Sequence, residues 1–266
     1  MHRDAMSATP DPKPETPDPF DPPPPGRIDM HSHVLPGIDD GCTTVTESLE
    51  SVRALIAHGY SASFCTPHCW PTLYPANTPT HIAIWVQALR QELEREGLDY
   101  TLYPGGELRL YPAVVPWMQS NGVPTLGDSR FVLCDFWEKK WPKWVDKAFD
   151  WLLEQGYTPI LAHPECSAGP KDYEKHLDRW TERGVILQGN FQCFTGEAGF
   201  RADELVRKYM DAGRYTLLAL DMHRPDSLQG RLDGIAVASD EYGADRIDAM
   251  TDDAVRALLW PEASAG

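Results

Sequence analysis

The chain has 266 residues, of which 42% are hydrophobic, so it can form either one large α/β domain or two small domains. Its formal net charge of −16 and its pI near 4.9 argue against a nucleic-acid partner, because binding the phosphate backbone requires a basic face. The apolar runs are too short for a membrane-spanning helix, and the first residues do not resemble a signal peptide. We therefore expect a cytoplasmic protein without membrane insertion.

Residues 1–26 are rich in proline, with Pro22 to Pro25 in one run. Proline prevents helices and central strands, and this stretch contains little apolar surface to bury. The sequence predicts a disordered tail over residues 1–26, followed by a folded domain over residues 27–266.

From Arg27 onward, short apolar runs alternate with amphipathic helices. The first run ends at His31, and the helix after it opens with the capping box Thr44 to Glu47. The second run covers residues 62–66, and its helix begins at Thr78 and stops at Gly97. Further runs occupy residues 100–103, 131–134, 158–162, 184–187 and 215–220, with helices predicted at 143–155, 171–183 and 199–212.

About seven strand-plus-helix units predict a parallel α/β protein. A distorted (β/α)7 TIM-like barrel is the preferred arrangement. An open, doubly wound sheet is the alternative, although the chain lacks the glycine-rich dinucleotide fingerprint that often accompanies that fold.

Polar residues recur just past the predicted strands. His31 and His33 are two residues apart, so on a strand their side chains point to the same face. The strand ends of a parallel barrel open on one face, which brings all these residues together. The set after successive strands comprises His31, His33 and Asp40, then His68, Glu107, Asp135, His163, Asn190, and finally Asp221 and His223.

Five imidazoles and up to four carboxylates exceed what one tetrahedral ion can use, so we expect two or three divalent ions with shared ligands. Nitrogen and oxygen ligands without thiolate suit manganese, iron or zinc. Such a cluster is suited to phosphoester hydrolysis, in which His223 or Asp135 would protonate the leaving oxygen. None of the six cysteines, which we expect to be reduced thiols, precedes an arginine by six residues, so the phosphate loop of cysteine-dependent phosphatases is missing.

Several motifs together resemble the PHP (polymerase and histidinol phosphatase) superfamily, and specifically its bacterial capsular-polysaccharide-type tyrosine phosphatase branch. The first is Asp29 to Gly41, DMHSHVLPGIDDG, which is similar to the opening motif of that branch almost residue for residue. The resemblance extends over roughly residues 27–260. The other motifs are Thr66 to His68, Gly106 to Arg109, Gly156 to Glu165, Gln188 to Asn190 and Asp221 to His223.

The resemblance implies a distorted barrel of the PHP type, up to three metal ions with manganese favoured, and hydrolysis of phosphotyrosine. The usual substrate in that branch is the tyrosine-rich tail of a bacterial kinase that controls polysaccharide export. Asp135 stands where the family usually has glutamate. By matching position, the implied metal ligands are His31, His33, Asp40, His68, Glu107, His163, Asp221 and His223.

The chain departs from this pattern at Cys166, where the family motif has the arginine that is expected to hold phosphate. A charge-assisted contact of this kind is worth a few kcal/mol, so another cation has to replace it if activity is to be strong. Candidates for that cation are Arg109, Arg224, Arg231 and Lys139.

The segment Phe136 to Trp144 follows the fourth predicted strand and contains three tryptophans and three lysines. Trp137 and Lys139 are candidate substrate contacts, because an indole can stack on a phosphotyrosine ring and an ammonium can attract its phosphate. Asn190 is a third candidate contact. Alternatively, the tryptophans anchor the following helix and the lysines are solvated.

Two other functions remain open at this stage. The missing arginine is compatible with a phosphatase of a small phosphorylated metabolite. It is also compatible with a weakly catalytic, metal-stabilised protein that binds a phosphotyrosine tail. The sequence leaves the oligomeric state open.

Overall fold

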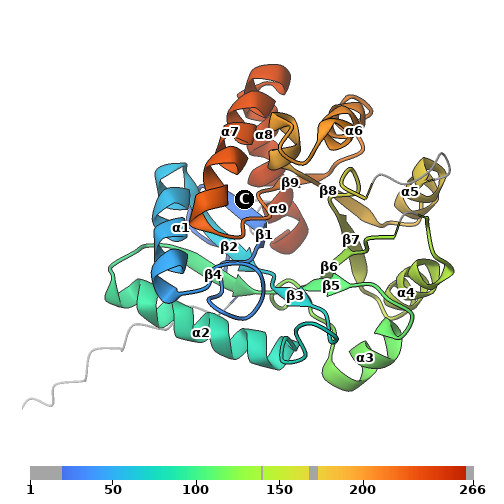
Figure 1. Cartoon of the computed structure of the whole chain (residues 1–266), viewed down its shortest axis with the longest axis horizontal. Coiled ribbons are helices and arrows are strands. Elements are labelled where there is room, and N and C mark those ends of the chain that lie inside the picture. The colour runs from blue at the N-terminus through green and yellow to red at the C-terminus, as the bar shows by residue number, and fades with distance from the viewer. Residues whose placement is uncertain (1–19, 139, 168–172, 262–266) are drawn as a thin grey trace, which may run out of the picture.

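The computed structural model describes residues 20–138, 140–167 and 173–261, and Figure 1 shows its helices arranged around the strands. The strands are β1 (Arg27–Ser32), β2 (Tyr60–Cys65), β3 (His68–Cys69), β4 (Thr101–Pro104), β5 (Glu107–Arg109), β6 (Phe131–Asp135), β7 (Thr158–Ala162), β8 (Ile186–Asn190) and β9 (Leu217–Ala219).

Helices alternate with the strands along the chain. They are α1 (Val45–Ala57), α2 (Pro79–Arg95), α3 (Val114–Asn121), α4 (Lys143–Glu154), α5 (Tyr173–Thr181), α6 (Phe200–Asp211), α7 (Pro225–Tyr242), α8 (Ala244–Thr251) and α9 (Asp253–Leu259), with the short 3₁₀ helix η1 (Phe191–Thr195) after β8.

The strands form two parallel sheets, with the orders β1-β2-β4 and β3-β5-β6-β7-β8-β9. The sheets share two stretches of chain, because β3 continues β2 past Thr66 and Pro67, and β5 continues β4 past Gly105 and Gly106. Proline has no N–H to give to a ladder, which explains the interruption after β2. The mixed α/β class with parallel strands is thus as predicted.

The end of β1 lies beside the segment that follows β9. Ser32 and Met222 form an isolated parallel bridge, and the His33 N–H donates to the Met222 carbonyl at 2.7 Å. Alternate residues of β1, β2, β7 and β9 form one enclosed apolar cluster, while a larger cluster lies between strands and helices. The residues of the enclosed cluster include Ile28, Met30, Ala62, Phe64, Ile160, Ala162, Leu217 and Ala219.

Most predicted elements agree with the structure to within one or two residues. At α1, Thr44 accepts a hydrogen bond from the Glu47 N–H as expected, and the Glu47 carboxylate accepts from the Thr43 N–H at 2.6 Å. β8 begins two residues later than its predicted start at Gly184 and extends to Asn190. The sequence reading did not identify α3, α7, α8 and α9.

The predicted tail, residues 1–26, is described only from Phe20. The Phe20 ring packs on Tyr103 and Trp260, with ring centroids 5.7 and 5.2 Å apart. The Trp260 indole N–H donates to the Phe20 carbonyl at 2.6 Å. The predicted boundary at residue 27 therefore lies within a segment that packs on the domain.

None of the helices in the described part of the chain combines the length and the apolar character needed to cross a lipid bilayer.

Candidate metal centre

The eight predicted metal ligands come together at the carboxyl ends of the strands. His31 belongs to β1, and His68 and Glu107 begin β3 and β5, the short strands that continue β2 and β4. His163 directly follows β7, and Asp221 lies two residues after the end of β9. The parallel arrangement brings residues from distant parts of the chain to one end of the strands, as the sequence predicts.

The buried carboxylate of Glu107 lies at the centre of the site. Its Oε2 atom is 2.8 Å from His68 Nδ1 and 3.4 Å from His31 Nε2. Its Oε1 atom is 3.0 Å from His163 Nε2. Oε2 is buried and makes no hydrogen bond of acceptable geometry, so it has a lone pair available among imidazole nitrogens. That environment suits a cation.

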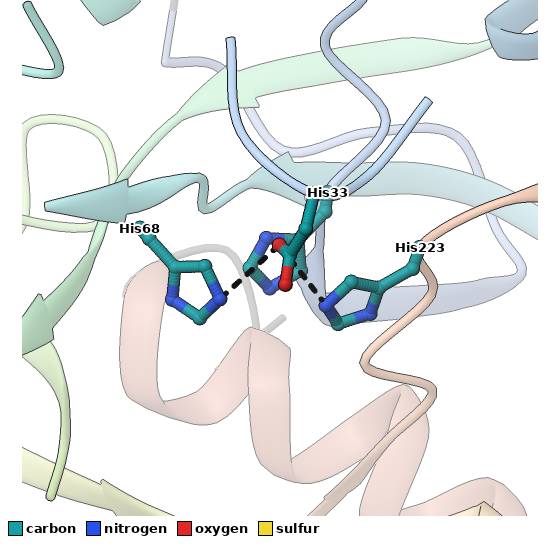
Figure 2. A group of neighbouring side chains, drawn as sticks. His33, His68 and His223 are labelled. Carbon is teal, nitrogen blue, oxygen red and sulfur yellow. Dashed lines mark ion pairs between the residues drawn. The ribbon is translucent and has the colours of Figure 1, made fainter. Parts of the chain in front are cut away.

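A second group of ligands surrounds Asp40 at the outer side of the site. Figure 2 shows the rings of His33, His68 and His223 turned toward one another, with dashed lines for two ion pairs. His68 Nε2 and His223 Nε2 lie 3.3 and 3.5 Å from Asp40 Oδ1. Asp40 is exposed, whereas His33 is buried, so this group connects the interior of the site with solvent.

The donor atoms fall into three groups that fit metal ions, because in each the ligand atoms all lie within 4.8 Å of one another. His31 and His33 each belong to two groups, as expected where neighbouring ions share a site. The groups are His33, Asp40, His68 and His223; His31, His33 and Asp221; and His31, Glu107 and His163.

The charges of these ligands depend on one another. Burial raises the pKa of Asp221, but the charge of His31 and a hydrogen bond from His33 outweigh burial and lower it. Burial lowers the pKa of His68, but Glu107 and Asp40 outweigh it and raise that pKa to about 12. The Asp221 carboxylate is thus ionised and the His68 ring holds a proton, which a divalent cation would displace.

Asp39, which the sequence does not single out, positions two of the predicted ligands, His33 and His68. Its Oδ2 atom lies 2.7 Å from His33 Nδ1 and accepts from the His68 N–H at 3.0 Å, while Oδ1 accepts from the Gly41 N–H at 3.0 Å. A carboxylate on Nδ1 leaves Nε2 free to bind a metal and fixes the orientation of the ring. The only signal in the sequence was its place beside Asp40 in the opening motif.

A second positioning network passes through β8. Gln188 Oε1 lies 3.0 Å from His31 Nδ1, and Gln188 Nε2 donates to Asn190 Oδ1 at 2.7 Å. Asn190 Nδ2 donates in turn to Asp221 Oδ2 at 2.9 Å. The sequence predicts that Asn190 contacts substrate, but its side chain is fully buried and its amide donates to Asp221, a predicted metal ligand. Asn190 therefore positions the Asp221 carboxylate.

Two ligands have unusual backbone conformations. His163 and Asp221 have φ angles of 33° and 50°, and they are the non-glycine residues with positive φ in the described chain. Such conformations are strained for residues with a Cβ atom and cluster at functional sites. These backbone conformations direct the side chains of His163 and Asp221 into the site just past β7 and β9.

Six of the eight predicted ligands border an open cavity of about 500 Å³, which also contacts Trp137 and Cys166, whereas His31 and His33 are buried and do not line it. The described residues that line it include no arginine or lysine. Arg109 is instead held between the rings of Trp70 and Trp137, at 5.0 and 4.9 Å from their centroids.

The other candidate cations are also engaged away from the cavity or cannot be placed. Arg224 Nη2 lies 3.0 Å from Asp226 Oδ2, and Arg231 Nε donates to the carbonyls of Leu220 and Asp221. Lys139 lies outside the described residues. The described chain therefore supplies no arginine or lysine side chain at the place where the cavity meets Cys166.

The two candidate proton donors differ in accessibility. The His223 ring borders the cavity. Asp135 is 1% exposed, neither of its carboxylate oxygens has a hydrogen-bond partner, and Arg109 Nη1 is 3.7 Å away. Burial and the neighbouring charge of Glu107 raise the pKa of Asp135 to about 7.

The tryptophans after β6 serve different purposes. Trp137 is 54% exposed and lines the cavity, as expected for a substrate contact. Trp141 stacks on His176 with centroids 4.8 Å apart and donates to Asp146 Oδ1 at 2.8 Å. For Trp141 the structure supports the alternative interpretation, in which the indole anchors α4.

A parallel α/β fold with clustered imidazoles and carboxylates at its strand ends defines a candidate polynuclear metal protein. The chain belongs to the family described as capsular polysaccharide synthesis, CpsB/CapC, which matches residues 27–259. It is 25% identical over 228 residues to the tyrosine-protein phosphatase YwqE of Bacillus subtilis, covering 85% of this chain and 89% of the relative. It is 26% identical over 249 residues to the tyrosine-protein phosphatase CpsB of Streptococcus pneumoniae, covering 88% and 99%.

The fold is similar to solved structures as well. One comes from a study of YwqE from Bacillus subtilis and CpsB from Streptococcus pneumoniae, described as unique metal-dependent tyrosine phosphatases; the TM-score is 0.76 at 26% identity, covering 87% of this chain and 94% of that one. An inactive dihydroorotase-like domain of a Chaetomium thermophilum protein gives a TM-score of 0.55 at 11% identity, covering 88% and 79%. This second likeness concerns the fold alone.

Proposed function

We propose that the chain is a metal-dependent phosphatase that hydrolyses phosphotyrosine in proteins. The observation that carries the proposal is the convergence of five histidines and three carboxylates in one cluster, six members of which border an open cavity, in a member of the CpsB/CapC family. The names of the relatives, tyrosine-protein phosphatases, support the choice of substrate class.

We further propose that the two sheets together form a distorted seven-stranded barrel. β2 with β3, and β4 with β5, each count as one bent strand, and the Ser32–Met222 bridge would join the first strand to the last. The enclosed cluster of alternate residues from β1, β2, β7 and β9 supports this view, because barrel interiors are filled in this way.

The three donor groups support two or three divalent ions, with manganese favoured and iron or zinc as alternatives. When bound, such ions lower the pKa of a coordinated water and neutralise phosphate oxygens. The chain itself has to hold the ligand rings in place, which Asp39 and Gln188 do from the side facing away from the cavity.

The protein side chains at the cavity have distinct proposed roles. His223 borders the cavity and is the better placed donor of a proton to the leaving phenol oxygen. Asp135 is buried and would influence the site through its electrostatic interaction with Glu107. Trp137 offers an exposed indole to the aromatic ring of the substrate. Arg109, stacked on Trp137, holds this indole in place and does not line the cavity.

The proposed partner is a phosphotyrosine protein, with the tail of a bacterial tyrosine kinase of polysaccharide export as the favoured case. The family description and the names of the relatives support this choice. A cytoplasmic location belongs to the same proposal.

The test uses full-length protein that has been stripped of metal and reloaded with manganese. Hydrolysis of a phosphotyrosyl peptide should fall to background with His68→Ala or with a chelator, and should persist with His58→Ala, a control at the exposed end of α1. Faster turnover of small alkyl phosphates than of the peptide would favour a metabolite phosphatase. Peptide binding without turnover would favour a binding protein.

Cys166→Arg tests the phosphate contact separately. Because the described lining contains no arginine or lysine, an arginine at this position should raise kcat/KM on the peptide by about tenfold or more, as a charge-assisted contact predicts. An unchanged kcat/KM would mean that another group already supplies the charge.

A further inference from the structure

A second cluster of donor atoms lies in the wall of the cavity, apart from the histidine ligands. Glu165 and Cys166 follow β7, and Cys193 belongs to η1. Cys166 Sγ is 3.5 Å from Cys193 Sγ, and Cys193 Sγ is 3.5 Å from Glu165 Oε1. Cys166 is exposed at the cavity, while the other two side chains are buried.

These spacings match those of a tetrahedral zinc site. With Zn–S bonds of about 2.3 Å and Zn–O bonds of about 2.1 Å, two thiolates on one ion lie about 3.8 Å apart and a thiolate and a carboxylate oxygen about 3.6 Å apart. The observed separations of 3.5 Å differ from these values by about 0.3 Å or less. Small rotations of the side chains would therefore complete the geometry.

The carboxylate of this cluster is held in place by two further groups. Glu165 Oε2 accepts from the Tyr215 hydroxyl at 2.6 Å, and Glu165 Oε1 accepts from the Asn190 N–H at 2.7 Å. Second partners of this kind orient metal ligands. Oε1 retains a lone pair toward Cys193, so the carboxylate can bind a cation without giving up its anchors.

We propose that Glu165, Cys166 and Cys193 form a site for one thiophilic divalent cation such as Zn²⁺. In the structure the Cys193 thiol donates to Glu165 Oε1 and shares a hydrogen bond with Cys166 Sγ. A soft cation would displace the thiol protons, and its charge would be balanced by two thiolates and a carboxylate. The fourth coordination position faces the cavity on the side of Cys166, and water or a small anion can fill it. The site is separate in chemistry from the main centre, whose ligands include no thiolate.

Cadmium is the probe, because its bonds to thiolates give an ultraviolet charge-transfer band that bonds to nitrogen and oxygen do not. Full-length protein is reduced with a phosphine, loaded with manganese, and titrated with Cd²⁺. The band should saturate at one equivalent in the monomer and disappear in both Cys166→Ser and Cys193→Ser. Glu165→Gln should keep the band but weaken cadmium binding by roughly tenfold.

Cys65→Ala is the matched control, because Cys65 is a buried thiol of β2 that does not line the cavity. It should leave the band unchanged. The Cys166→Ser variant keeps the test independent of folding, since that side chain is exposed. A missing band in the wild type, a band that survives in both serine variants, or a band that requires two chains by sedimentation would overturn the proposal.

Discussion

Replacing Asp39 with asparagine should weaken metal binding without removing a ligand. The side chain of Asp39 is buried, and although burial raises its pKa, the charge and hydrogen bond of His33 outweigh burial and keep the carboxyl ionised. In Asp39→Asn one oxygen becomes an NH₂ group. If that group replaces Oδ2, it faces the His68 N–H and His33 Nδ1, and both of these are donors when His33 binds metal through Nε2.

The size of the effect follows from those contacts. A hydrogen bond to a charged group is worth about 1.5–3 kcal/mol, and loss of a partner behind a ligand histidine typically lowers metal affinity about 10- to 100-fold. That range corresponds to about 1.4–2.8 kcal/mol of binding free energy. We therefore expect the Kd for manganese to rise by one to two orders of magnitude.

Calorimetric titration of metal-stripped protein with Mn²⁺ measures this Kd directly. The control is Asp128→Asn, which changes an exposed carboxylate before β6 and should leave the Kd unchanged. Thermal unfolding in chelator shows whether the metal-free variant is folded. An Asp39→Asn protein that is folded and binds manganese as tightly as the wild type would refute the assigned role.

Three further outcomes are expected. Chelator should lower the free energy of unfolding by about 2.7 kcal/mol relative to metal at 100 times its Kd, and the melting temperature by about 5–10 °C; equal melting curves would contradict this. Asp40 and Asp221 outweigh burial and raise the pKa of His223 to about 9. Manganese affinity, measured by titration, should therefore increase from pH 6.5 to 9, because the metal no longer has to displace a proton from His223. Over the same interval the metal-free protein should lose stability in unfolding experiments. Phe20→Ala should cost about 2 kcal/mol in denaturant unfolding and leave the kcat of folded protein unchanged, because Phe20 packs on Tyr103 and Trp260, and none of these three residues lines the cavity.

The positions of the ligands could be predicted because they depend on strand ends. An apolar run fixes where a buried strand stops, and parallel strands place the next polar residue at a common edge. His68 and His163 are 95 positions apart in the printed sequence, yet each lies 3.0 Å or less from an oxygen of Glu107. The fold class follows from the same periodicity.

The residues behind the ligands could not be predicted in this way. Gln188 and Asp39 carry no periodic signal, and their roles depend on side-chain distances that only the folded chain defines. Arg109 likewise looked like a free cation, because nothing in the sequence places Trp70 and Trp137 on either side of it. The sequence predicts that Asn190 contacts substrate, because a strand end shows on which face of the fold a residue lies. It does not show whether the side chain is buried, as that of Asn190 is.

One position links the departure from the family pattern with the second donor cluster. Cys166 removes an arginine that the resemblance expects at the cavity, and it also places a thiol 3.5 Å from Cys193. A single substitution to arginine would add a cation to the cavity and remove a ligand from the cluster. If Cys166→Arg increases turnover while it abolishes the cadmium band, the two properties exclude each other at this residue. In that case, a cysteine at position 166 provides a thiolate ligand at the expense of a charged contact to phosphate.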